Sequence, residues 1–141
     1  LVLEANGQRR ELRPFIVTFA NGPQYGSGAV INPGGKLDDG RLEAVFFEYE
    51  GSIAPVLMAA PRLFVGGLDR VAAYGRVSGT RVTVTADSPL EVHRDGDPVE
   101  ASDHIEVELV PRVLDVVVPA ATVADPKGPF TREVGATPPR S

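Results

Sequence analysis

The chain has 141 residues, 43% of them hydrophobic and 23% charged, which suffices for one globular domain with its own core. Its net charge of −5 argues against binding to duplex nucleic acid, which requires clustered Lys and Arg. It contains no cysteine, so disulfides, thiol catalysis and thiolate metal sites are excluded. No segment is apolar over the length that spans a bilayer, and we expect a cytoplasmic protein. Because Leu1 looks like part of a strand already under way, we expect a piece of a longer chain.

Turn signals divide the first half into short extended segments. Strands are predicted over residues 1–5, 12–20, 28–32 and 41–49. The dipeptide Asn6-Gly7 separates the first two, and it tolerates positive φ at both central positions of a turn. The last of these strands reads RLEAVFFEY, and its aromatic side chains should be buried.

One helix is predicted, over residues 53–65, because apolar side chains recur there at helical spacing. Ser52 can cap its first turn, where Pro55 is also tolerated. Pro61 should kink or split it. Such a helix would belong to the core or cover a sheet, and a contact with an acyl chain is the alternative.

The second half alternates with the period of a strand. Residues 74–78 and 81–85 are predicted to pair through a turn at Gly79-Thr80. Further strands are predicted over residues 90–94, 98–100, 105–110 and 113–118. We therefore predict an all-β domain over residues 1–119, a two-sheet sandwich with one short helical insertion. Residues 120–141 are rich in Pro, Gly and Thr and are predicted to form a flexible tail.

Two blocks of the sequence resemble one family. The run NGPQYGSGAVINPGGKLDDGRLEAVFF resembles the block NGxYxGgGxxixPxAxldDGxLdvv of the diacylglycerol kinase-like lipid kinases, which include bacterial lipid kinases and the sphingosine kinases. Later, RVTVTADSPLEVHRDGDPVE followed by IEVELVPRVLDVVVP resembles the ending of the same family, which contains a DGE turn. The resemblance extends from about residue 15 to residue 119.

The resemblance implies the second half of a two-domain enzyme. In the family, an N-terminal α/β domain carries a GGDGT-type loop for the nucleotide phosphates, a β-sandwich follows, and the lipid enters between them. This sequence contains no GGDGT run and no Gly-rich phosphate loop after a parallel strand. ATP would therefore be bound mainly by a missing N-terminal domain, and the chain alone should be inactive.

The resemblance also implies roles for the two acidic turns. Asp97 takes the position of the acid in the DGE turn and would accept the proton of the lipid hydroxyl, although Asp is one methylene shorter than Glu. Asp39, with the carbonyl oxygens of Lys36 and Arg41, would hold a Mg²⁺ ion. The structural alternative for both aspartates is an ordinary turn residue, and Asp95 is expected to cap its own turn.

The function that follows is transfer of the ATP γ-phosphate to a lipid hydroxyl, such as that of diacylglycerol or a long-chain base. The expected partners are the lipid, the missing N-terminal domain and a membrane surface touched peripherally, and a homodimer stays open. Two alternatives remain: a non-catalytic lipid- or ligand-binding β-module, and a purely structural β-domain. His93 and His104 lack a partner at ligand spacing and are expected to be packed or surface residues.

Overall fold

The computed structural model describes residues 1–26, 28–49 and 51–131. The strands are β1 (Val2–Ala5), β2 (Gln8–Glu11), β3 (Pro14–Ala20), β4 (Gln24–Tyr25), β5 (Ala29–Val30), β6 (Leu42–Glu48), β7 (Tyr74–Gly79), β8 (Arg81–Arg94) and β9 (Asp97–Glu108). The helices are α1 (Ala54–Ala59), α2 (Arg62–Val65) and α3 (Ala120–Ala124), with a 3₁₀ turn over Leu68–Arg70. None of these helices is long and apolar enough to cross a membrane.

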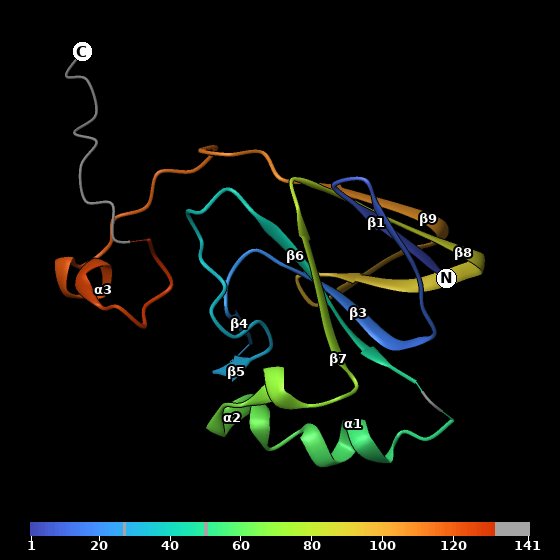
Figure 1. Ribbon diagram of the computed structural model, residues 1–141. Helices are drawn as coiled ribbons and strands as arrows, with labels where there is room; N and C mark the ends of the chain where they lie inside the picture. The colour runs from blue at the N-terminus through green and yellow to red at the C-terminus, as the bar shows by residue number, and fades with distance from the viewer. Residues whose placement is uncertain (27, 50, 132–141) are drawn as a thin grey trace.

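The strands form two antiparallel sheets that pack against each other (Figure 1). Sheet A has the order β2-β1-β8-β9, and sheet B has the order β3-β6-β7. The short pair β4-β5 stands apart as a third ladder. The predicted class, an all-β sandwich with a short helical insertion, is confirmed.

The main core lies between the two sheets. Sheet A contributes the buried side chains of Leu3, Ala5, Val82 and Val84, and sheet B contributes those of Leu42, Ala44, Phe46 and Val77. A second cluster lies on the opposite face of sheet B, where Phe47 packs with Ala59 of α1 and Leu68. Strand β6 is therefore covered on both faces, which explains why residues 42–47 are all buried and why these residues are apolar except at Glu43.

The chain changes sheet twice where the sequence suggested a simple hairpin. The Asn6-Gly7 turn is present, with φ of 49° and 75°, but the strand that follows it is β2, and β3 belongs to sheet B. The predicted pairing of residues 74–78 with 81–85 is wrong, because β7 pairs with β6 and β8 pairs with β1. Alternation identifies which face of a strand is buried, but it does not identify the neighbouring strand.

The helical insertion is split at Pro61 into α1 and α2, as predicted. The Ser52 hydroxyl accepts a hydrogen bond from the Ala54 amide at 3.1 Å, so it satisfies a free donor at the helix start. The N-cap residue is Ile53 and α1 begins at Ala54, one residue later than the predicted cap at Ser52 implies.

The chain after β9 differs most from the prediction. Residues 109–119 form no strand, and Leu114 and Val117 are 74% and 102% exposed. The segment predicted as a flexible tail contains α3, and residues 128–131 lie against the loop before β6. Residues 132–141 of that predicted tail lie outside the described residues.

Candidate functional site: two acidic turns

The early acidic turn connects β5 to β6. The Asp39 carboxylate accepts a hydrogen bond from the Arg41 amide at 2.9 Å, and Gly40 has a φ of 71°, a conformation that favours glycine. Asp39 is exposed, and this contact is the self-capping interaction of a turn aspartate. It uses one carboxylate oxygen, and no other hydrogen bond among the described residues engages this side chain.

A polar network centred on buried residues anchors the loop that leads into this turn. Asn32 is fully buried, and its Nδ2 donates to Glu43 Oε2 at 3.1 Å. The Arg76 guanidinium donates to Asn32 Oδ1 and to the Pro33 carbonyl, both at 3.0 Å. The network thus ties the loop before the acidic turn to β6 and β7. No motif predicted this network, although Glu43 inside the otherwise apolar stretch 42–47 of β6 was a signal.

The neighbouring Asp38 differs from Asp39 because both of its oxygens are occupied. The amide and the hydroxyl of Thr131 donate to Asp38 Oδ1 and Oδ2, each at 2.7 Å. Thr131 lies 93 positions away in sequence, and no motif indicated the contact. Of the two adjacent carboxylates, Asp39 is the one left open to an external ligand.

The donors predicted to act with Asp39 are of the chemical kind that suits a hard cation with few protein ligands. The carbonyl oxygens of Lys36 and Arg41 accept no hydrogen bond among the described residues, and Asp39 retains an unengaged oxygen. Mg²⁺ is commonly bound through one or two carboxylates with the remaining positions filled by water. No cluster of three or more His, Cys, Asp or Glu side chains suited to a metal occurs in residues 1–26, 28–49 and 51–131. Binding would therefore rest on one carboxylate.

The late acidic turn is the tip of the β8–β9 hairpin. Asp95 and Gly96 have φ of 52° and 98°, and Arg94 pairs with Asp97 across the turn, as in a tight two-residue hairpin. Asp97 is exposed at the start of β9. The cap predicted for Asp95 is absent, since its carboxylate makes no hydrogen bond within the described part of the chain. Asp95 serves the turn through its backbone, because Asp tolerates positive φ better than most residues.

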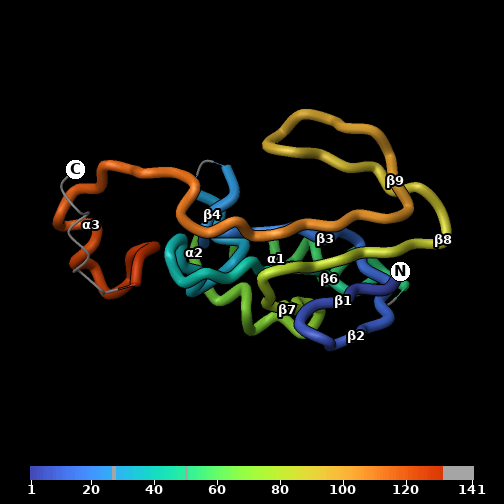
Figure 2. Tube along the Cα trace, turned by 90° about the horizontal axis from the view of Figure 1, so that it is seen from above, coloured from blue at the N-terminus to red at the C-terminus, as the bar shows by residue number. Residues whose placement is uncertain are grey.

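The long hairpin bends back over the sandwich. Its register shifts between Thr85 and Val92, and Figure 2 shows the two strands turning sharply there. The tip of the β8–β9 hairpin consequently points back toward the side of the molecule where β4 lies (Figures 1 and 2). No hydrogen bond or ion pair of the described residues joins Asp39 to Asp97. The roles assigned to Asp39 and Asp97 stay predictions.

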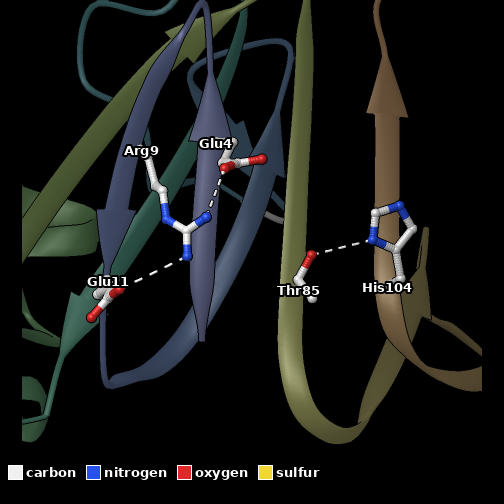
Figure 3. Close-up of polar contacts among 5 residues, drawn as sticks. All are labelled: Glu4, Arg9, Glu11, Thr85 and His104. Atoms are coloured by element: carbon white, nitrogen blue, oxygen red, sulfur yellow. Dashed lines mark hydrogen bonds and ion pairs between the residues drawn. The ribbon is translucent and has the colours of Figure 1, made fainter.

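The outer face of sheet A carries several exposed polar pairs. Arg9 lies 3.4 Å from Glu4 and 3.9 Å from Glu11, and His104 Nδ1 lies 3.2 Å from the Thr85 hydroxyl (Figure 3). Exposed ion pairs of this kind contribute little to stability. An open hollow of about 690 Å³ lies between this sheet and the end of β6 and contains neither acidic turn. We assign no chemistry to this face.

Under the helical insertion, the half-buried Tyr74 has a buried hydroxyl. Its ring meets Phe47 edge to face, with 5.7 Å between the ring centroids. The hydroxyl has no hydrogen-bond partner among the described residues. Burial raises the pKa of Tyr74, the Arg76 guanidinium opposes this, and the carboxylates of Asp69 and Glu43 add to it.

Comparison with known families accounts for this arrangement. Residues 1–118 match the family described as the YegS C-terminal NAD kinase beta sandwich-like domain. The chain belongs to this family. Two curated relatives of this YegS C-terminal domain, both named "Probable lipid kinase YegS-like", come from Xanthomonas euvesicatoria pv. vesicatoria and Xanthomonas axonopodis pv. citri. Each is 34% identical over 106 residues, which is 72% of this chain and 32% of the relative.

Solved structures support the same fold. Two structures of a "putative diacylglycerol kinase" from Bacillus anthracis str. Sterne align with TM-scores of 0.62 and 0.64 at 22% and 18% identity. The alignments cover 78% of this chain and 37% and 36% of the solved chains. The chain thus spans about a third of the length of the curated relatives and solved chains it matches, and the predicted membership in the lipid kinase family is confirmed.

Proposed function

We propose that this chain is the lipid-binding and catalytic-base domain of a lipid kinase that transfers the ATP γ-phosphate to a lipid hydroxyl. Diacylglycerol and long-chain bases are the substrate classes. Membership in the YegS C-terminal family and the names of its relatives support kinase chemistry. The observation that carries the role of this domain is the exposed Asp97 carboxylate on the tip of a hydrogen-bonded hairpin.

The proposed chemistry requires one proton acceptor. As the lipid oxygen bonds to the γ-phosphorus, the bond to the leaving ADP oxygen breaks, and the hydroxyl proton passes to the Asp97 carboxylate. In such transfers the protein contributes mainly positioning and electrostatic stabilisation. A paired hairpin suits this task because it holds its tip residue in a fixed direction.

ATP would be bound mainly by a nucleotide-binding domain elsewhere in a longer protein. Asp39 and the carbonyls of Lys36 and Arg41 would hold Mg²⁺, which when bound offsets the negative charge of the phosphates. The lipid substrate would bring the enzyme to the cytoplasmic surface of a membrane as a peripheral protein. The chain alone is expected to transfer no phosphate.

A non-catalytic lipid-binding module is the second candidate. The observation that favours it is Asp97 itself, because the matching position of the family block is the longer Glu. A displaced base costs on the order of 10²-fold in rate when reacting atoms move by about 1 Å. In this case the hairpin tip would contact a lipid headgroup without turnover.

The test is a transfer assay on the longer protein, with labelled ATP and diacylglycerol or sphingosine in mixed micelles. Asp97→Asn should lower kcat by about 10²- to 10⁴-fold, the usual contribution of a general base. Asp95→Asn is the matched control, since it removes the other carboxylate of the same turn and should leave more than half of the activity.

Three outcomes separate the candidates. A fully active Asp97→Asn enzyme removes this residue from the mechanism, and loss of activity in Asp95→Asn alone moves the base to Asp95. A longer protein that binds lipid without transferring phosphate supports the non-catalytic module. Absence of lipid binding as well leaves a purely structural domain.

A further inference from the structure

The end of the described chain is fastened to the early acidic turn. We define the C-terminal strap as residues 128–131. The Lys36 ammonium donates to the Gly128 carbonyl, and the Leu37 amide donates to the Pro129 carbonyl at 2.7 Å. Thr131 then donates twice to Asp38. Three consecutive residues of the turn are thus held by the C-terminal strap.

The strap has its own support before it reaches the turn. The Asp125 carboxylate accepts from the Lys127 amide at 2.9 Å, and the Gly128 amide donates to the Asp125 carbonyl at 3.0 Å. Gly128 is buried, and a Cβ there would lie 2.8 Å from the Thr122 carbonyl of α3. The approach of the strap is therefore set by a local turn packed on α3.

The contacts end one residue before Asp39. The strap engages Lys36, Leu37 and Asp38, and Asp39 bonds only to its own turn at Arg41. The strap therefore restrains the segment that leads into Asp39, through the Leu37 amide and the side chains of Lys36 and Asp38, without occupying the Asp39 carboxylate. The double hydrogen bond to Asp38 is charge-assisted, and such bonds are among the stronger ones in proteins.

We propose that the C-terminal strap is a positioning element for the divalent-cation site, with Thr131 as its positioning residue. The strap holds the carbonyl of Lys36 and the carboxylate of Asp39 on one rigid turn. Without the strap, these two groups would lie on an exposed loop and would be free to move apart. The consequence for cation binding rests on the proposed function, whereas the strap itself does not.

The first measurement is amide hydrogen exchange by NMR on the chain as it is. The Leu37 amide donates to the strap at Pro129, and the Thr131 amide donates to the turn at Asp38. Both amides should therefore be protected while the strap contacts the turn. Thr131→Val removes the hydroxyl and should speed exchange of the Leu37 amide on the order of 10-fold, the value of a charge-assisted hydrogen bond. Thr131→Ser should restore protection, and Thr122→Val is the control on α3.

The second measurement is a Mg²⁺ titration followed by the amide shifts of Gly40 and Arg41. Thr131→Val should raise the midpoint several-fold, and Thr131→Ser should return it to that of the original chain. An unprotected Leu37 amide, or protection unchanged in Thr131→Val, overturns the strap. A faster Leu37 exchange with an unchanged midpoint overturns its positioning role. Failure of the original chain to bind Mg²⁺ while Leu37 stays protected counts instead against Asp39 as the cation anchor.

Discussion

Gly35 carries no side chain because Asn32 already fills the space. A Cβ at Gly35 would lie 2.1 Å from the Asn32 amide nitrogen, far inside van der Waals contact. The family block has Ala at this position and an unspecified residue at position 32. The glycine therefore accommodates the buried Asn32, which in turn donates a hydrogen bond to Glu43 of β6.

Gly35→Ala should destabilise the fold by roughly 1–3 kcal/mol, the usual cost of overpacking. The same change in an Asn32→Ala background should cost much less, because the colliding amide is gone. Urea unfolding of the four proteins in a double-mutant cycle measures the coupling. Equal costs in both backgrounds would show that the two positions are independent and that the collision is relieved elsewhere.

At the scale of elements, the helical insertion covers Tyr74 and thereby couples its ionisation to folding. The folded-state pKa of Tyr74 is raised above its ordinary value of 10.0, so the unfolded chain loses this proton first as the pH rises. The unfolded chain then binds fewer protons than the folded one, and stability falls as the pH passes 10.

Tyr74→Phe should remove this component of the pH dependence. The free energy of unfolding of the original chain, relative to the Phe variant, should decrease between pH 8 and pH 11 in urea titrations. At pH 8 the variant should be as stable or more stable, since the lost hydroxyl has no hydrogen-bond partner among the described residues. Tyr49→Phe, at a 45% exposed position, is the control. A parallel pH profile for Tyr74→Phe would contradict the assignment.

The sequence predicted the turns and the break in the helix better than it predicted which strands pair with each other. The dipeptides Asn6-Gly7 and Asp95-Gly96 identified two hairpins because positive φ is restricted to few residue types, and Pro61 split the helix for a similarly local reason. The pairing of β7 with β6, and not with β8, depends on which sheet each strand joins. That choice is made by packing between distant segments, such as those that bring Val82 and Phe46 into one core, and leaves no local signal.

In the candidate site, too, local features were predictable from the sequence and contacts between distant residues were not. Both acidic turns were recognisable as turns, and Asp39 and Asp97 were named from a resemblance covering both blocks. The partner of Asp38 was not predictable, because Thr131 lies in a segment whose composition indicated flexibility. The Asn32–Glu43 pair was not predicted, because no local pattern showed that β6 is covered on both faces and that Glu43 is therefore buried.

At the scale of the whole molecule, an apolar run after β9 lies on the surface. Val113, Leu114 and Val116 are 73%, 74% and 68% exposed, and they lie, with Asp115 between the last two, in a segment without a sheet partner in the described residues. Contiguous exposed apolar side chains of this kind favour association.

The separate chain should therefore self-associate with rising concentration, and the double variant Leu114→Lys/Val116→Lys should shift it to monomer. Sedimentation velocity at several concentrations measures the effect. Ser88→Lys, at an exposed position of β8, is the control for added positive charge and should not change the association. An original chain that sediments as a monomer throughout would contradict the expectation.

The contact between the C-terminal strap and the acidic turn affects where the C-terminal boundary of this domain should be set. The family match ends at residue 118, ten positions before Gly128. A shortened protein cut at that boundary would retain every strand of both sheets and still release Asp38 from Thr131. Anyone truncating relatives of this chain by family limits alone would then be measuring cation affinity on an untethered loop.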